Sequence, residues 1–397
     1  MSLGPKLAVE RLRALGQSVW IDDLTREMIE RGQLAELRDE GVSGITANPT
    51  TFDKAVTGSQ LYDEAIKQLA DRKKPDAILW DLLVEDVRAA ADILRPVYDN
   101  TDGLDGFVSI EVDADIAYDS QRTMNMAAEL WSRCQRPNIF IKIPATEPAL
   151  PAIEAMLARG VNVNVTLIFS LARYQQVVEA FLAGMETRQA QGDPVEGVMS
   201  VASFFVSRVD AKVDAALRLR LAEAAAPEER QLLESLLGRI GIANSKLAYQ
   251  ESRRLHSGSR WERLASHGAR VQRCLWASTS VKDPAYPATM YVEALAGPDT
   301  INTMPLKTYE ALSEANLKGP ALLEDGWATE QLQALEWLGI DLPQLTHQLE
   351  IEGVHSFAES YRHLIGGLAA KIEERGWNRV TAASQDSFPA SDPPGWT

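Results

Sequence analysis

Short runs rich in β-branched residues recur along the chain, and a segment with helical periodicity follows each of them. The runs are short enough to be buried strands, and between them Leu, Ala and Val recur every three or four positions. This alternation of strands and helices predicts a parallel sheet. We expect strands at Ser18–Ile21, Gly44–Ala47, Phe107–Val112, Ile139–Ile143, Val161–Leu167, Val198–Phe205, Arg273–Ala277 and Thr300–Met304.

The side-chain alternation within these strands favours a closed barrel over an open sheet. In Ile139–Ile143 the three isoleucines share one face, while Lys142 lies on the other. In the following strand Asn164 and Thr166 alternate with valines in the same way. Such polar residues gather towards the carboxyl ends of the strands, where a barrel of this kind has its active site. The sequence therefore predicts an α/β protein, a (β/α)₈ TIM barrel.

Two helical segments exceed what an eightfold barrel requires. Residues 211–266 are almost continuously helical in character, and so is the chain from Met304 to about residue 375. We expect both segments to pack on the barrel, so that residues 1–375 form one barrel domain with helical additions. Residues 376–397 are rich in Pro and Ser, and this composition predicts a disordered tail.

The charge balance excludes some classes of partner. The 397 residues include 40 Lys and Arg against 56 Asp and Glu, which gives a formal net charge of −16. Because no basic run offsets this charge, we expect neither nucleic acid nor a membrane to bind. The longest apolar stretches, of about ten residues, are too short to cross a bilayer. The N-terminus lacks the apolar core of a signal peptide, so we expect a cytoplasmic protein. For its oligomeric state we expect either a monomer or a homodimer.

Lys142 is the most informative residue in the sequence. An ammonium on the inner face of a strand is costly to bury, and burial favours the neutral amine, which can attack a ketone. Judged by its position in the strand alone, Lys142 would more commonly be a structural lysine whose amine reaches the rim of the barrel or pairs with an acid. Five other strands, however, have inward polar groups at the same end, and their convergence favours a substrate site. They are Asp22, Asn48, Glu111, Asn164 with Thr166, and Ser203.

Few kinds of chemistry suit this set of residues. An amine, two carboxylates and several neutral hydrogen-bonding groups fit Schiff-base chemistry on a carbonyl compound. All five histidines lie outside the predicted strands, so we expect no metal site. Glycine-rich phosphate and dinucleotide motifs are absent from the sequence, so we expect no nucleotide cofactor. Cys134 and Cys274 lie far apart in the chain and are interpreted as buried core thiols.

Five blocks at the predicted strand ends have a distinctive sequence. They are Val19–Asp22 (VWID), Gly44–Thr50 (GITANPT), Val108–Asp113 (VSIEVD), Ile141–Thr146 (IKIPAT) and Gly160–Ser170 (GVNVNVTLIFS). In content and order they closely resemble the strand-end motifs of transaldolases, in particular those of a longer bacterial type. The resemblance extends over roughly residues 15–310, and the NPT and IKIPAT blocks are its most specific parts.

The resemblance implies an activity and four catalytic residues. Lys142 would form the Schiff base, and Asp22 would be the acid and base beside the sugar hydroxyl. Glu111 and Thr166 would hold and activate the catalytic water. The expected enzyme is a transferase of the pentose phosphate pathway. It would move a dihydroxyacetone unit from sedoheptulose 7-phosphate or fructose 6-phosphate to an aldose phosphate, with no cofactor and with sugar phosphates as its partners.

The same resemblance implies substrate-binding residues. The segment Ser203–Arg208 (SFFVSR) resembles the family's SPFVGR phosphate segment, although Phe204 and Ser207 replace its proline and glycine. At Ala277–Lys282 (ASTSVK), Ser280 stands where many relatives have arginine; we expect Lys282 to supply the cation, with a solvated loop lysine as the alternative. The full set comprises Asn48 and Asn164 for the three-carbon fragment, together with Ser203, Phe205, Arg208, Ser278 and Lys282.

Two other functions remain open. Fructose-6-phosphate aldolase-like enzymes are much shorter relatives in which a glutamine and a tyrosine manage the water. The matching positions here are Glu111 and Phe205, which favours transfer over release. From a different class, the chain would be a catalytically silent protein that binds sugar phosphates. The presence of Lys142, Asp22 and Glu111 together argues against that function.

Overall fold

Eight parallel strands close into a barrel in the computed structural model, which describes residues 4–47, 49–324 and 327–377. Each strand pairs with the next in chain order, and β8 pairs with β1 to close the sheet. The predicted (β/α)₈ TIM barrel is therefore confirmed. The strands are β1 (Gln17–Ile21), β2 (Gly44–Thr46), β3 (Phe107–Glu111), β4 (Ile139–Pro144), β5 (Val163–Ile168), β6 (Ser200–Phe205), β7 (Arg273–Ala277) and β8 (Thr300–Met304).

β5 and β6 each begin two residues later than predicted, and the side chain of Asn162 joins the segments that precede them. Its Nδ2 donates to the carbonyls of Pro137 and Ile139 at 3.0 and 3.2 Å. Its Oδ1 accepts the backbone N–H of Met199 at 2.9 Å. The Asn162 carboxamide thereby supplies partners to main-chain groups near the starts of β4 and β6.

Helices cover the outside of the barrel, and within the described ranges none of them is both long and apolar enough to span a bilayer. The amphipathic segments predicted between the strands are helical. The helices up to β6 are α1 (Pro5–Ala14), α2 (Arg26–Glu30), α3 (Gln33–Asp39), α4 (Pro49–Gly58), α5 (Asp63–Ala70), α6 (Pro75–Asn100), α7 (Ser120–Cys134), α8 (Leu150–Ala158) and α9 (Leu171–Ala190).

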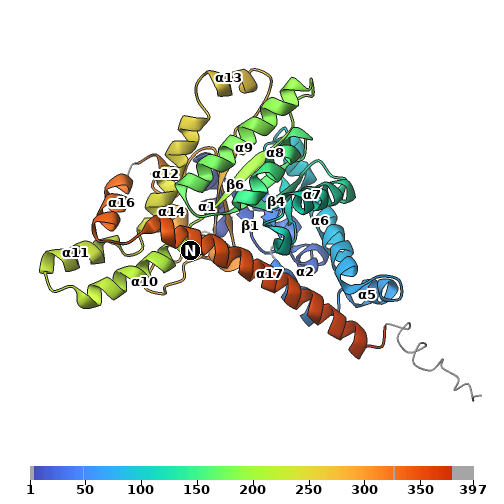
Figure 1. The fold of residues 1–397 in the computed structure, drawn as a ribbon. Coiled ribbons are helices and arrows are strands. Elements are labelled where there is room, and N and C mark those ends of the chain that lie inside the picture. The colour runs from blue at the N-terminus through green and yellow to red at the C-terminus, as the bar shows by residue number, and fades with distance from the viewer. Residues whose placement is uncertain (1–3, 48, 325–326, 378–397) are drawn as a thin grey trace, which may run out of the picture.

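The segment 211–266 is a series of helices and not one continuous helix. Pro227 starts the second of them at its first turn, and Gly238 and Gly258, with φ of +66° and +81°, mark the later breaks. In Figure 1, α10 and α11 form a hairpin that projects from the barrel. The helices are α10 (Ser207–Glu223), α11 (Pro227–Leu236), α12 (Ile240–Leu255) and α13 (Ser259–Ala265), followed by α14 (Met290–Ala294) after β7.

The last part of the chain ends in one long helix. After β8 come α15 (Leu306–Ala311), α16 (Ala328–Trp337) and α17 (Leu342–Glu374), and α17 crosses much of the width of the molecule (Figure 1). Asp341 caps α17 by accepting the N–H of Gln344 at 2.9 Å. At its other end, the backbone N–H groups of Gly376 and Trp377 donate to the carbonyls of Glu373 and Ile372. Residues 378–397, most of the predicted tail, lie outside the described residues.

A buried arginine ties three strands together at the amino-terminal end of the barrel. Arg273 of β7 is 6% exposed, and its Nη2 donates to the Ser18 hydroxyl and to the Thr300 carbonyl, both at 2.7 Å. These contacts join β7 to β1 and β8 around the closing edge of the sheet. Removal of the guanidinium leaves buried acceptors without a donor.

We therefore expect Arg273→Met to lower the free energy of unfolding by about 3 kcal/mol, because buried hydrogen bonds to a charged donor are lost. The matched control is Arg270→Met, which removes an ion pair to Asp102, a side chain that is 97% exposed. That change is expected to cost about 1 kcal/mol or less. Urea denaturation measures both, and equal losses in the two variants would contradict a structural role specific to Arg273.

Candidate active site

A cavity of about 180 Å³ lies at the carboxyl ends of the strands. Eight of the eleven predicted site residues line it. Thr46, Ser280, Thr303 and Phe357 line it as well, of which only Ser280 was singled out by the sequence analysis. The predicted residues around the cavity are Asp22, Lys142, Thr166, Ser203, Phe205, Arg208, Ser278 and Lys282.

Lys142 forms a buried ion pair with Glu111. The two residues are partners in the parallel register of β3 and β4, and Lys142 Nζ lies 2.9 Å from Glu111 Oε2. Their side chains are 7% and 1% exposed, respectively. Burial raises the pKa of the Glu111 carboxyl, an effect that the positive charge of Lys142 opposes. A proton shift from the amine to this carboxylate gives the neutral amine that a nucleophile requires.

Asp22 is held directly after β1 by its backbone and its side chain. Its N–H donates to the Met304 carbonyl at 2.9 Å, and its Oδ1 accepts the Thr46 hydroxyl at 2.7 Å. Burial raises the pKa of Asp22, and Lys142 and the Thr46 hydroxyl oppose that rise. Thr46 also lies 3.1 Å from the Thr303 hydroxyl. The alternation in β2 could have revealed Thr46, since it shares a face with Gly44.

Asn164 is fixed by a chain of side-chain hydrogen bonds across three strands. Its Nδ2 donates to Ser109 Oγ at 3.1 Å, and its Oδ1 accepts the Ser203 hydroxyl at 2.7 Å. Asn164 is also the register partner of Lys142, which places the two residues side by side on adjacent strands. The carboxamide is thereby oriented beside the amine. Ser203 faces Asn164, so its hydroxyl serves this network within the barrel.

Two buried oxygen atoms near the amine have no hydrogen-bond partner among the described residues. They are Thr166 Oγ1 and Glu111 Oε1. A backbone irregularity follows Thr166, because the register to β6 shifts between Val165 and Ile168 and Leu167 has a φ of +59°. Both oxygen atoms are able to bind a polar group of a substrate or a water molecule.

Cations lie along one side of the cavity. Arg208 belongs to the first turn of α10, and its Cζ lies 5.5 Å from the centroid of the Phe205 ring. Burial lowers the pKa of Arg208, while Asp22 and Glu111 oppose this effect. Lys282 is exposed, and its Nζ donates to Ser280 Oγ at 2.9 Å. Arg208 and Lys282 thus offer two cationic groups that suit an anionic part of a ligand, beside Asp22 and Asp23, which also line the cavity.

The two departures from the family's phosphate segment have structural explanations. Phe204, in place of proline, is fully buried and lies edge-on to Trp276 at 6.3 Å between ring centroids. Ser207, in place of glycine, lies 2.9 Å from the Ser278 hydroxyl and donates its N–H to the Ser278 carbonyl at 3.0 Å. The β6 and β7 ends are therefore joined through these serines. The predicted site residue Asn48 lies outside the described residues.

Phe357 is a further residue of the cavity that sequence reasoning missed. It belongs to α17, far along the chain from the strand motifs, and it lines the cavity together with Lys142 and Arg208. Its position in the buried stripe of α17 follows from helical spacing with Val354, Tyr361 and Leu364. Nothing in that spacing says which end of the barrel the helix covers.

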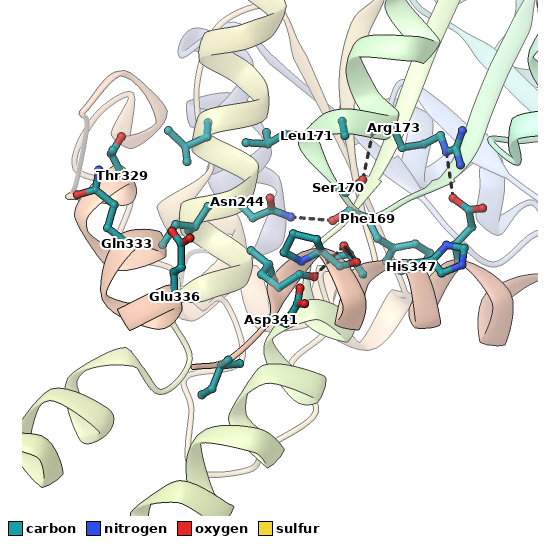
Figure 2. A pocket seen from close by; sticks show the side chains of 18 of the residues that line it. Phe169, Ser170, Leu171, Arg173, Asn244, Thr329, Gln333, Glu336, Asp341 and His347 are labelled. Carbon is teal, nitrogen blue, oxygen red and sulfur yellow. Dashed lines mark hydrogen bonds and ion pairs between the residues drawn. The ribbon is translucent and has the colours of Figure 1, made fainter. Parts of the chain in front are cut away.

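A larger groove, of about 940 Å³, lies beside this cavity and is lined by α9, α12, α16 and α17 (Figure 2). Asn244 donates to the Phe169 carbonyl at 2.8 Å there, and Arg173 pairs with Glu350 at 3.1 Å. Phe169 also contacts Phe205 of the smaller cavity, with 5.1 Å between ring centroids. Eight predicted site residues line the smaller cavity, Glu111 and Asn164 do not, and none of the ten described ones lines this groove.

Comparison with known proteins shows the family of this chain. Residues 19–368 match the family described as transaldolase/fructose-6-phosphate aldolase. The chain is 46% identical to a transaldolase of Parafrankia sp. over 91% of its length and 97% of the relative's. It is 44% identical to transaldolase 1 of Streptomyces avermitilis over 93% and 96%. It is 40% identical to transaldolase 2 of Nostoc sp. over 91% and 97%. This chain belongs to the transaldolase/fructose-6-phosphate aldolase family.

Proposed function

We propose that this protein is a transaldolase, a transferase that moves a dihydroxyacetone unit between sugar phosphates through a Schiff base on Lys142. The observation that carries the proposal is the buried pair of Lys142 and Glu111, 2.9 Å apart, whose lysine lines the same cavity as Asp22. An amine next to a carboxyl that can take its proton is equipped to attack a ketone. A second carboxyl then serves as the acid and base of carbon–carbon bond cleavage.

The first half of the reaction forms the covalent intermediate. Neutral Lys142 attacks the C2 carbonyl of the donor ketose phosphate and gives a carbinolamine. Loss of water from this adduct, assisted by Glu111 and Thr166, gives the protonated Schiff base, which is an electron sink. Asp22 then takes the proton of the C4 hydroxyl as the C3–C4 bond breaks. An aldose phosphate leaves, and the three-carbon unit stays on Lys142 as an enamine.

The second half runs in the opposite direction with a different aldehyde. The enamine attacks the acceptor carbonyl, Asp22 returns its proton to the new alkoxide, and water releases the product ketose from Lys142. Sedoheptulose 7-phosphate or fructose 6-phosphate would be the donor, as in the pentose phosphate pathway. The hydrogen-bonded Asn164, with Asn48, would orient the three-carbon unit.

Arg208 and Lys282 supply the charge for phosphate recognition in this proposal. Arg208 is the more buried of the two and presents a planar guanidinium that suits bidentate contact. Lys282 lines the same cavity beside Ser280, the position where many relatives have arginine. Together with Ser278 they would hold the phosphate away from the reacting carbons.

Transfer is favoured over aldolase activity, because Glu111 keeps a carboxylate beside the amine and Phe205 offers no hydroxyl to activate water. A cytoplasmic location fits the two cysteines, Cys134 and Cys274, which are buried free thiols. We regard free sugar phosphates as the partners, and neither nucleic acid nor a membrane surface.

The Schiff-base assignment predicts that Lys142→Ala and Lys142→Arg both abolish transfer and leave folding intact, because neither side chain can form the imine. Borohydride reduction in the presence of fructose 6-phosphate, followed by peptide mass mapping, should place a reduced three-carbon adduct on Lys142 of the unmodified protein. Lys246, the other buried lysine of the described residues, is the internal control. An adduct on Lys246, or activity retained in either variant, would contradict the assignment.

The phosphate assignment predicts a change in discrimination between substrates. We expect Arg208→Ala to raise KM for fructose 6-phosphate about tenfold or more, because a charge-assisted contact to phosphate is lost. Lys282→Ala should have a smaller effect, since Lys282 is exposed. Initial-rate kinetics with fructose as the unphosphorylated reference test this. Equal losses on both substrates would point instead to damage in the Ser203–Arg208 segment.

The Thr46 contact predicts a shift of the pH profile. Asp22 must be ionised to accept the hydroxyl proton, so activity falls as the pH drops through its pKa. Because the Thr46 hydroxyl lowers that pKa, Thr46→Val should raise it and move the acid limb of kcat to higher pH. The matched control is Thr303→Val, which removes the neighbour of Thr46 but not the contact to Asp22. An acid limb that stays in place, or moves equally in both variants, would refute the role of Thr46.

A further inference from the structure

A side chain of the C-terminal helix covers the reactive amine. Phe357 is 5% exposed, and its ring centroid lies 5.4 Å from Lys142 Nζ and 5.9 Å from Arg208 Cζ. The ring therefore lies next to the nitrogen that would carry the covalent intermediate and next to the cation expected at the phosphate. Lys142, Arg208 and Phe357 come from β4, α10 and α17, so only the folded chain brings them together.

Contacts one helical turn to either side hold Phe357 in this position. Gly353 lies against the barrel so closely that a Cβ there would be 3.1 Å from Leu167 Cδ2. Tyr361 donates its hydroxyl to the Glu111 carbonyl at 3.1 Å and stacks on Trp80 with 5.5 Å between centroids. Residues four positions apart lie on the same face of a helix, so these contacts fix the direction of Phe357.

An apolar ring in this place affects the fate of the enamine. In hydrolysis the enamine takes a proton at C3 to become the iminium, and water adds to C2 to give a carbinolamine. The C2–N bond then breaks, which releases dihydroxyacetone and regenerates the amine of Lys142. The sum is enamine plus water to dihydroxyacetone plus free amine. Transfer also needs water at C2, but only after the acceptor has joined the three-carbon unit. Release differs in that C3 of the enamine is protonated and water adds before an acceptor has joined it, beside Lys142 in the region that the Phe357 ring borders.

We propose that Phe357 is a specificity-determining residue that restricts water at the Lys142 adduct and thereby favours transfer to an aldehyde over release of dihydroxyacetone. This inference rests on the proposed function. The ring suits the task because it excludes water and yet tolerates a neighbouring cation, since the face of an aromatic ring attracts positive charge. The protonated Schiff base therefore remains compatible with an apolar neighbour.

The experiment measures how the intermediate partitions. With fructose 6-phosphate as donor and erythrose 4-phosphate as acceptor, the ratio of free dihydroxyacetone to sedoheptulose 7-phosphate is determined by chromatography. We expect Phe357→Ala to raise this ratio about tenfold, which requires only a small change in the difference between the activation free energies of release and of transfer. Phe357→Leu keeps apolar cover and should leave the ratio close to that of the unmodified protein. The control for general effects on α17 is Ile351→Ala, because Ile351 lies on the same helix but is 49% exposed.

The outcomes separate this inference from the proposed function. If the unmodified protein forms no adduct that borohydride can trap and transfers nothing, the proposed function fails. If it transfers normally but Phe357→Ala lowers transfer and release in parallel, so that the ratio stays constant, Phe357 has only a structural role and the inference is overturned. A ratio that rises as much in Ile351→Ala as in Phe357→Ala overturns it as well.

Discussion

The parallel register of three neighbouring strands is the constraint on which the site depends. Register places Glu111 of β3 beside Lys142 of β4, and Lys142 beside Asn164 of β5. A slip of one residue in either pairing would move Lys142 to the outer face, among the isoleucines beneath the helices. The barrel prevents such a slip, because its closure fixes the stagger of every strand relative to its neighbours. The acid, the amine and the amide therefore meet without any loop having to position them.

This arrangement also explains how charges can be buried in the barrel. Lys142 and Glu111 compensate each other at 2.9 Å, and Asp22 and its hydroxyl donor Thr46 line the same cavity as Lys142. Taken alone, any of these groups would be costly to desolvate. As a set they hold protons that can move over short distances. The raised pKa values of Asp22 and Glu111, both caused mainly by burial, are the expected result of this environment.

The helices added to the barrel bring parts of the site that the strands do not provide. α10 begins directly after β6 and carries Arg208 in its first turn, so the position of this guanidinium depends on the end of that strand. α17, the last helix of the described residues, places Phe357 against Lys142. The chain thus uses a late, long helix to complete a cavity whose polar residues come from the strands. Arg208 and Lys282 are cationic groups of that cavity in a chain whose net charge is −16.

The sequence by itself determined the eight strands, their order and the inward face of Lys142, because a period of two within short apolar runs fixes which side chains share a face. It also indicated Asp22, Glu111, Thr166 and Arg208, since each follows or ends a strand in a distinctive motif. Only the tertiary structure decided which of these side chains contact one another and which distant groups join them. Thr46 and Phe357 are examples: one acts through a hydrogen bond across strands, and the other reaches the cavity from a helix 215 residues after Lys142. Local patterning records the face on which a residue lies, but the partner on that face depends on packing between segments that are remote in sequence.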